Sequence, residues 1–210
     1  LKEKKTMNYQ FWPEISLYLD EIRKEKEVLS RDDLNIDMMG EVRENINHYL
    51  EQLKLSFEQS LDKQYASLAL FAIVAYVDED IQRQLVETRK GSWNPLQKDF
   101  YGAHNAGEVF FETIDKIIDN PEVPSIVLEV YYFMLNKGFL GKYRDSKTHI
   151  AKYLDLLKDK IPVITPVQEG ASGSKEMETK KYRIKKWHYY ACAGALSICV
   201  LCLLYFTSSH

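Results

Sequence analysis

The chain has 210 residues, of which 45% are hydrophobic, so it can bury one core of about 160 residues and still supply a membrane segment. Its 28 basic and 31 acidic residues leave a net charge of −3, which gives no electrostatic reason to expect a nucleic-acid partner. All three cysteines (Cys192, Cys199 and Cys202) lie in a C-terminal apolar run, which excludes a disulfide framework or a cysteine metal cluster elsewhere in the chain.

The first 161 residues are predicted to form an all-α domain, because apolar residues recur at helical spacing between turn signals and no two-residue alternation predicts a sheet. A first apolar stripe runs from Ile15 to Ile22. A second stripe, from Met38 to Phe57, follows Asp32 and Asp33, which are candidate helix caps.

The third predicted helix, Tyr65 to Val77, is apolar on nearly every face and follows Asp62 as a candidate cap. At 13 residues it is too short to span a bilayer, so we expect it to be the core of the bundle. The next helix is predicted to run unbroken from Asn94-Pro95 to Ile117. Gly107 inside it weakens a helix, which predicts that a neighbouring helix packs closely there.

Two further helices complete the predicted domain. Pro124 is expected to start one of them and Gly138 to end it, since proline suits the first turn of a helix and glycine the residue after the last turn. The other carries apolar residues from Ile150 to Leu157 and stops at Ile161-Pro162.

The C-terminal part of the chain is predicted to be a membrane anchor. Residues 162–187 are read as a polar tether and basic juxtamembrane segment, 188–207 as a transmembrane helix and 208–210 as a short periplasmic tail. The uncharged run from Tyr189 to Phe206 would cover roughly 27 Å of a hydrocarbon core about 30 Å thick; a buried core helix is the alternative. Basic residues precede the span and none follows it, which predicts a cytoplasmic N-terminal side. These topology residues are Lys180, Lys181, Arg183, Lys185 and Lys186.

The acidic cluster of Asp78, Glu79 and Asp80 directly follows the most apolar predicted helix. Two interpretations stay open. One is a solvated helix end, and the other is an exposed docking patch for a basic or hydrogen-bonding partner. The spacing is not that of a calcium loop.

The remaining polar residues predict no catalytic, metal or cofactor site. Glu108 and Glu129 lie within apolar stripes, so each is expected to accept hydrogen bonds or to pair with a base such as Arg144. His104 and Glu108 share a predicted helix face, but two donors do not make a metal site. No glycine-rich phosphate loop is present, and the nearest match to a nucleophile elbow, residues 170–174, lies in the tether.

Several segments together resemble the DotU/TssL (IcmH) family, the inner-membrane component of type VI and type IVB secretion systems. They are Ala75 to Glu79 (AYVDE), Trp93 after a short gap, Phe100 to Phe111 (FYGAHNAGEVFF) and Leu128 to Arg144 (LEVYYFMLNKGFLGKYR). Within them the family motif falls on Trp93, Gly107, Glu108, Glu129, Gly138, Phe139, Gly141, Tyr143 and Arg144.

The resemblance implies a hook-like domain of two small helical bundles on the cytoplasmic face of the bacterial inner membrane, without enzymatic activity or cofactor. It implies a scaffold for effector export that joins an IcmF/TssM-type inner-membrane partner to cytoplasmic baseplate or equivalent machinery, with a homodimer as a possible further assembly. By motif position, Asp78 and Glu79 would be the family's acidic surface pair. A membrane-tethered enzyme and a tail-anchored adaptor unrelated to secretion stay open as alternatives, and the residues do not separate type VI from type IVB.

Overall fold

The computed structural model describes residues 8–102 and 105–161, and every regular element in these two stretches is helical. The all-α prediction is therefore confirmed for this part of the chain. The elements in chain order are α1 (Asn8–Val28), α2 (Ile36–Ser60), α3 (Lys63–Glu87), α4 (Gln97–Tyr101), α5 (Ala106–Ile117), α6 (Ser125–Asn136), the 3-10 helix η2 (Gly141–Tyr143) and α7 (Lys147–Lys160).

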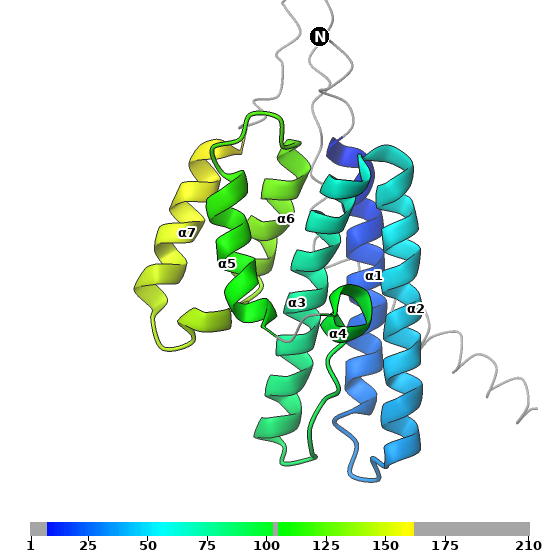
Figure 1. The fold of residues 1–210 in the computed structure, drawn as a ribbon. Helices are drawn as coiled ribbons and strands as arrows, with labels where there is room; N and C mark the ends of the chain where they lie inside the picture. Colours follow the sequence, from blue (N-terminus) through cyan, green and yellow to red (C-terminus); the bar gives the residue numbers. More distant parts are fainter. Residues whose placement is uncertain (1–7, 103–104, 162–210) are drawn as a thin grey trace, which may run out of the picture. The chain divides into compact units, whose positions relative to one another are not determined.

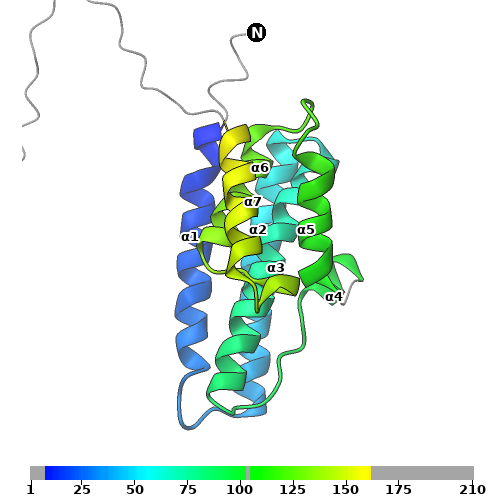
Figure 2. The same cartoon turned by 90° about the vertical axis from the view of Figure 1, so that its left-hand side faces the viewer.

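The helices form two groups, and helices of both groups pack against α3. The long helices α1, α2 and α3 lie side by side, and α5, α6 and α7 form a second group against α3 (Figures 1 and 2). Helix α3 contacts α2 on one side and α5 and α6 on the other. The buried side chains of both groups join into one continuous core, so the two groups belong to a single compact unit.

Helix α3 is the core helix that the sequence predicts. Its residues from Ala69 to Ala75 are all buried, because apolar side chains occupy every face and helices from both groups cover them. The helix continues past the predicted end at Val77, since Ile81 and Leu85 repeat the apolar spacing for two more turns. The acidic cluster thus lies in the middle of a helix and not at its end.

The second group is built around aromatic side chains. The ring centroids of Phe110 and Phe139 lie 4.2 Å apart, and those of Phe111 and Tyr143 lie 4.7 Å apart, edge to face. Such contacts add stability beyond the apolar area that they bury. They join α5 to the segment after α6, which holds five of the residues that carry the family resemblance: Gly138, Phe139, Gly141, Tyr143 and Arg144.

Helix α2 begins later than predicted. Its N-cap is Asn35, whose side-chain oxygen accepts a hydrogen bond of 2.9 Å from the backbone N–H of Met38. Asp32 and Asp33 are exposed and lie before this cap, so the prediction that they cap the helix is wrong. Asp62 does occupy the N-cap position of α3, but its side chain makes no capping hydrogen bond.

The single helix predicted from Asn94 to Ile117 is two helices, α4 and α5. Helix α4 ends at Gly102, which adopts a left-handed conformation (φ +63°) and donates its N–H to the carbonyl of Lys98 at 2.9 Å. The chain resumes a helix at Ala106, and the apolar side chains of α5 again face the core. The apolar spacing in the sequence therefore continues across the break and does not reveal it.

Helix α6 has the boundaries that its proline and glycine predict. Pro124 is its N-cap, and Gly138 (φ +100°) follows its last turn. The N–H of Gly138 donates to the carbonyl of Leu135 at 3.0 Å, and the N–H of Phe139 donates to that of Met134 at 3.1 Å. This pair of hydrogen bonds is the Schellman motif, in which glycine is favoured.

The predicted membrane anchor lies outside the described residues. Within residues 8–102 and 105–161, no helix combines the length and the apolar character needed to cross a bilayer. The tether (162–187), the predicted span (188–207), the tail (208–210) and the five basic topology residues all fall beyond this part of the chain.

Candidate functional site

The acidic cluster on α3 consists of three consecutive carboxylates at mid-helix. Successive residues of an α-helix point about 100° apart, so the side chains of Asp78, Glu79 and Asp80 leave the helix in three directions. Each therefore meets a different neighbouring segment. The exposure that the sequence suggested is wrong: Asp78 is only 4% exposed, and Glu79 and Asp80 are partly buried.

Asp78 holds the segment between α3 and α4. Its Oδ1 accepts hydrogen bonds of 2.8 Å from the Trp93 indole Nε1–H and from the backbone N–H of Leu96, and its Oδ2 accepts one of 2.8 Å from the backbone N–H of Gln97. A buried carboxylate is costly unless such donors compensate it. Because two of the donors belong to the first turn of α4, Asp78 fixes where that helix starts.

The protonation of Asp78 follows from its burial. Loss of solvent raises the pKa of this carboxyl above its ordinary value, and the hydrogen bonds from Gln97, Leu96 and Trp93 oppose that effect. The guanidinium of Arg43 opposes it further.

Gln97 extends this hydrogen-bonded network to the next helix. Its backbone is held by Asp78, and its buried side-chain oxygen accepts a hydrogen bond of 2.8 Å from the backbone N–H of Ala106, the first residue of α5. One carboxylate thus positions the starts of two helices. Gln97 was not predicted from the sequence, since nothing local distinguishes it from a surface glutamine.

Glu79 joins α3 to the segment that follows α6. Its two carboxylate oxygens accept hydrogen bonds from the backbone N–H groups of Leu140 (2.9 Å) and Gly141 (2.7 Å). Gly141 in turn lies against Gly107 of α5, so closely that a Cβ on Gly141 would come within 2.6 Å of the Gly107 carbonyl oxygen. The close approach predicted at Gly107 is confirmed, although the neighbour is the start of η2 and not another α-helix.

Asp80 joins α3 to α1. It forms an ion pair with Lys26, in the last turn of α1, and accepts a hydrogen bond of 2.7 Å from Arg83 one turn along α3. Arg83 also donates to the carbonyl of Gly138 at 3.3 Å. The third carboxylate therefore connects the first group of helices to the end of α6.

A groove of about 250 Å³ opens beside Asp80. It is lined by Leu19, Asp20, Ile22, Arg23, Lys26, Tyr76, Val77, Asp80 and Lys137, from α1, α3 and the end of α6. Asp20 pairs with Arg23 at 3.1 Å and Asp80 pairs with Lys26, so both acids of the lining are already occupied. The Lys137 ammonium lies 5.2 Å from the ring centroid of Phe133 and has no carboxylate partner among the described residues.

The hydroxyl of Tyr76 adds a neutral donor to this groove. Burial, with a smaller contribution from Asp80, raises the pKa of Tyr76 to about 12, so the phenol stays protonated at neutral pH. The Tyr76 hydroxyl is itself hydrogen-bonded to Asp80, and the largely exposed guanidinium of Arg23 pairs with Asp20. Lys137 is the basic group of the lining that has no carboxylate partner among the described residues.

The other predicted motif residues have structural surroundings. Trp93 and Phe139 are buried, and the ring of Tyr143 stacks on that of His149 at 4.6 Å. Glu129 accepts a hydrogen bond of 2.9 Å from the indole of Trp12, as expected for a carboxylate in an apolar stripe.

Glu108 and Arg144 differ from their prediction. Glu108 is exposed in the first turn of α5, where a negative charge favours the helix, and Arg144 is exposed as well. No ion pair joins these two described residues, so the expectation that Glu108 pairs with a base such as Arg144 is not met. No three His, Cys, Asp or Glu side chains gather as metal ligands within residues 8–102 and 105–161, and His104 lies outside them.

Comparison with known proteins gives a family match. The family model described as type VI secretion system protein DotU matches residues 27–210. The fold is similar to that of DotU from Francisella novicida, with 26% identity and a TM-score of 0.61 over 71% of this chain and 98% of that chain. It is also similar to SciP/TssL of the type VI system of enteroaggregative Escherichia coli 042, with 19% identity and a TM-score of 0.52 over 77% of this chain and 95% of that chain.

No curated protein matches the chain. The likeness to the Escherichia coli protein shows the fold alone, because its identity is low. The family match extends over most of the sequence and includes all four segments that carry the resemblance. The chain belongs to the DotU family of type VI secretion system proteins.

Proposed function

We propose that this type VI secretion component is a structural scaffold of the membrane complex that supports effector export. In this proposal residues 188–207 anchor it in the bacterial inner membrane, and the helical body lies on the cytoplasmic side. An IcmF/TssM-type inner-membrane protein binds it, and the helical body links that partner to cytoplasmic baseplate machinery. The observation that carries the proposal is the use of Asp78, Glu79 and Asp80 to hold α1, α4 and η2 on one helix.

This use of the acidic cluster favours a scaffold over an enzyme. A catalytic carboxylate must face substrate, whereas these three are occupied by backbone N–H groups, an indole and basic side chains. Rigid positioning of several segments is what a binding surface requires. The type IVB assignment rests on the resemblance alone, while the family description names the type VI system.

The groove beside Asp80 is the proposed contact for the cytoplasmic partner. Its two acids are paired within the chain, whereas Lys137 has no carboxylate partner among the described residues and Arg23 is largely exposed. A complementary partner segment would therefore carry carboxylates beside an apolar side chain. This reverses the expectation of a basic partner. Asp78 and Glu79 do not contact the partner in this proposal. They contribute by holding α4 and η2 in place.

Purification of the full chain in detergent from its own cells tests this proposal. We expect an IcmF/TssM-type protein and a baseplate component to co-purify with the wild type. Arg23→Glu with Lys137→Glu should release the cytoplasmic component and keep the membrane partner, because rim charges affect association more than folding. Lys147→Glu with Lys152→Glu, two exposed lysines on α7, is the matched control and should keep both. Retention of both partners by the groove variant would rule out the groove as the contact.

A further inference from the structure

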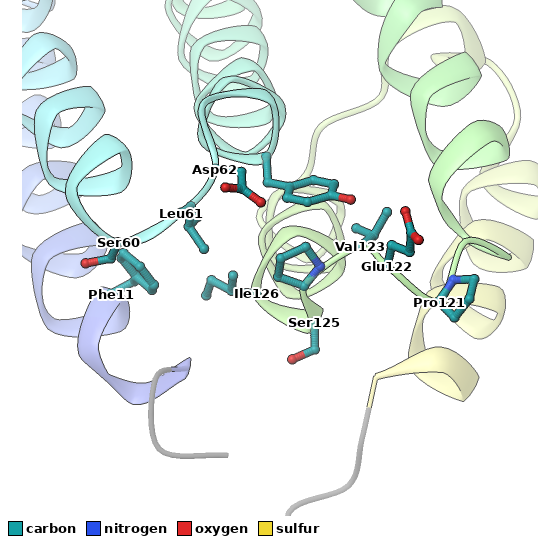
Figure 3. A pocket seen from close by; sticks show the side chains of 11 residues that line it. Phe11, Ser60, Leu61, Asp62, Pro121, Glu122, Val123, Ser125 and Ile126 are labelled. Carbon is teal, nitrogen blue, oxygen red and sulfur yellow. The ribbon is translucent and has the colours of Figure 1, made fainter. Parts of the chain in front are cut away.

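A second hollow, of about 350 Å³, lies where the start of α1 meets two connections between helices. Figure 3 shows its lining, which comes from the α2–α3 turn on one side and from the α5–α6 loop on the other. The lining residues are Phe11, Ser60, Leu61, Asp62, Tyr65 and the segment from Pro121 to Ile126. The hollow thus spans both groups of helices.

Two carboxylates of this hollow have no partner in the described part of the chain. Asp62 lies at the N-cap position of α3 without a capping hydrogen bond, and Glu122 uses only its backbone N–H, which donates to Asn120. Neither forms an ion pair with any described residue. The two come from different groups of helices, and the apolar residues Leu61, Val123 and Ile126 line the same hollow.

The segment of the chain closest in sequence to this hollow is basic. Residues 1–7 (LKEKKTM) carry three lysines and one glutamate, with apolar residues at both ends. They precede Asn8, the first residue of α1, and Phe11 of that first turn lines the hollow. Lys4 and Lys5 stand three or four residues before α1, a length of at most about 14 Å of chain, so their ammonium groups can reach the hollow.

We propose that residues 1–7 bind in this hollow, with their lysines paired to Asp62 and Glu122. Their charge complements the two carboxylates, and Leu1 or Met7 supplies an apolar side chain for the lining. Bound in this way, the segment joins the start of α1 to both the α2–α3 turn and the α5–α6 loop. It is a second connection between the two groups of helices. The first is made by Asp78 and Glu79, which lie in the middle of α3 and accept hydrogen bonds from α4 and from the segment after α6.

Zero-length carbodiimide coupling tests this binding directly, because it joins a carboxylate to an amine only where the two touch. In the full chain in detergent we expect Lys2, Lys4 or Lys5 to be coupled to Asp62 or Glu122. The exposed pair Lys160–Asp119, at 2.7 Å, is the internal positive control. Asp37 and Glu87, exposed at other helix ends, should not be coupled to these lysines.

Mixing isotope-labelled with unlabelled protein identifies the occupant. Coupling within one molecule supports the proposal. Coupling between copies would instead assign the hollow to a second molecule and overturn it. Coupling of Lys160 to Asp119 without any product between residues 1–7 and the hollow would overturn it as well.

Cleavage by trypsin gives an independent measurement. If the segment is bound, Asp62→Asn with Glu122→Gln should speed cleavage after Lys4 and Lys5 by about tenfold, since two partly exposed ion pairs are lost. Asp37→Asn with Glu87→Gln is the matched control and should leave the rate unchanged. Equal rates in the wild type and both variants would contradict the proposal.

Discussion

Asp78 is the residue on which the arrangement of α4 depends most, because it alone accepts three hydrogen bonds from the segment before and within that helix. In an asparagine at this position the amide oxygen would still accept from Trp93 and Leu96. The amide NH₂, however, would face the N–H of Gln97 and leave a buried donor unpaired. We expect Asp78→Asn to lower the free energy of unfolding by about 1–3 kcal/mol.

Denaturation of the full chain in urea, followed by the loss of helical circular dichroism, measures this cost. Asp155→Asn on α7 is the matched control, since that side chain is exposed, and it should change stability by less than about 0.5 kcal/mol. An Asp78→Asn protein as stable as the control would show that the three hydrogen bonds do not contribute measurably to the free energy of unfolding.

The same residue predicts a pH dependence. Burial raises the pKa of Asp78 above its ordinary value, so the folded state holds the proton more tightly than the unfolded state. Its contribution to stability is then complete below the ordinary pKa of 3.8 and declines as pH rises through the raised value. We expect the stability difference between wild type and Asp78→Asn to shrink across this range in urea titrations at successive pH values. A difference that grows with pH would mean a lowered pKa.

The acidic cluster was singled out correctly from the sequence but was placed wrongly. Three charges after an apolar run look like a helix end, whereas Ile81 and Leu85 continue the spacing of Val77 and carry the helix onward. That signal was present in the sequence. The partners of the carboxylates were not, because Trp93, Leu140 and Lys26 reach them only through the packing of separate elements.

At the scale of elements, the contact between α5 and η2 depends on two glycines. Gly141 has φ +49°, and a Cβ there would meet the Gly107 carbonyl oxygen at 2.6 Å and the Phe111 ring at 3.0 Å. We expect Gly141→Ala to cost at least about 2 kcal/mol, from the left-handed backbone and the clash together. Thermal unfolding of the full chain measures the loss.

Gly40 provides the matched comparison, since it lies in α2 and a methyl group added there would have nothing within 4 Å. Gly40→Ala should raise stability by about 0.5–1 kcal/mol through helix propensity alone. If both alanine variants shift the unfolding temperature in the same direction, the close approach of α5 and η2 is not what requires glycine at position 141.

Helix boundaries were predictable where local chemistry sets them. Pro124 and Gly138 bound α6 because proline and glycine have their own backbone preferences. The division between α4 and α5 was not predicted, since the apolar spacing continues across Gly102. Gly102 ends α4 with its left-handed backbone. The start of α5 is held by the hydrogen bond that the N–H of Ala106 donates to the side chain of Gln97, whose own backbone is held by Asp78.

At the scale of the whole molecule, α3 connects the two groups of helices and its carboxylates fix their mutual placement. The all-apolar stretch of α3 already predicted that other helices surround it. Which helices do so followed only from the structure, because each group is an amphipathic set that could pack on the other in several ways. A body built in this manner is consistent with the proposed scaffold role.

Effector export in cells that lack this gene tests the scaffold directly. We expect that export is lost, that the wild type and Glu108→Gln restore it, and that Arg23→Glu with Lys137→Glu does not, although this variant keeps its helical content. Glu108 is exposed and makes no contact on which the fold depends, so its amide should be tolerated. Export that continues at the normal level without the chain would contradict the scaffold role.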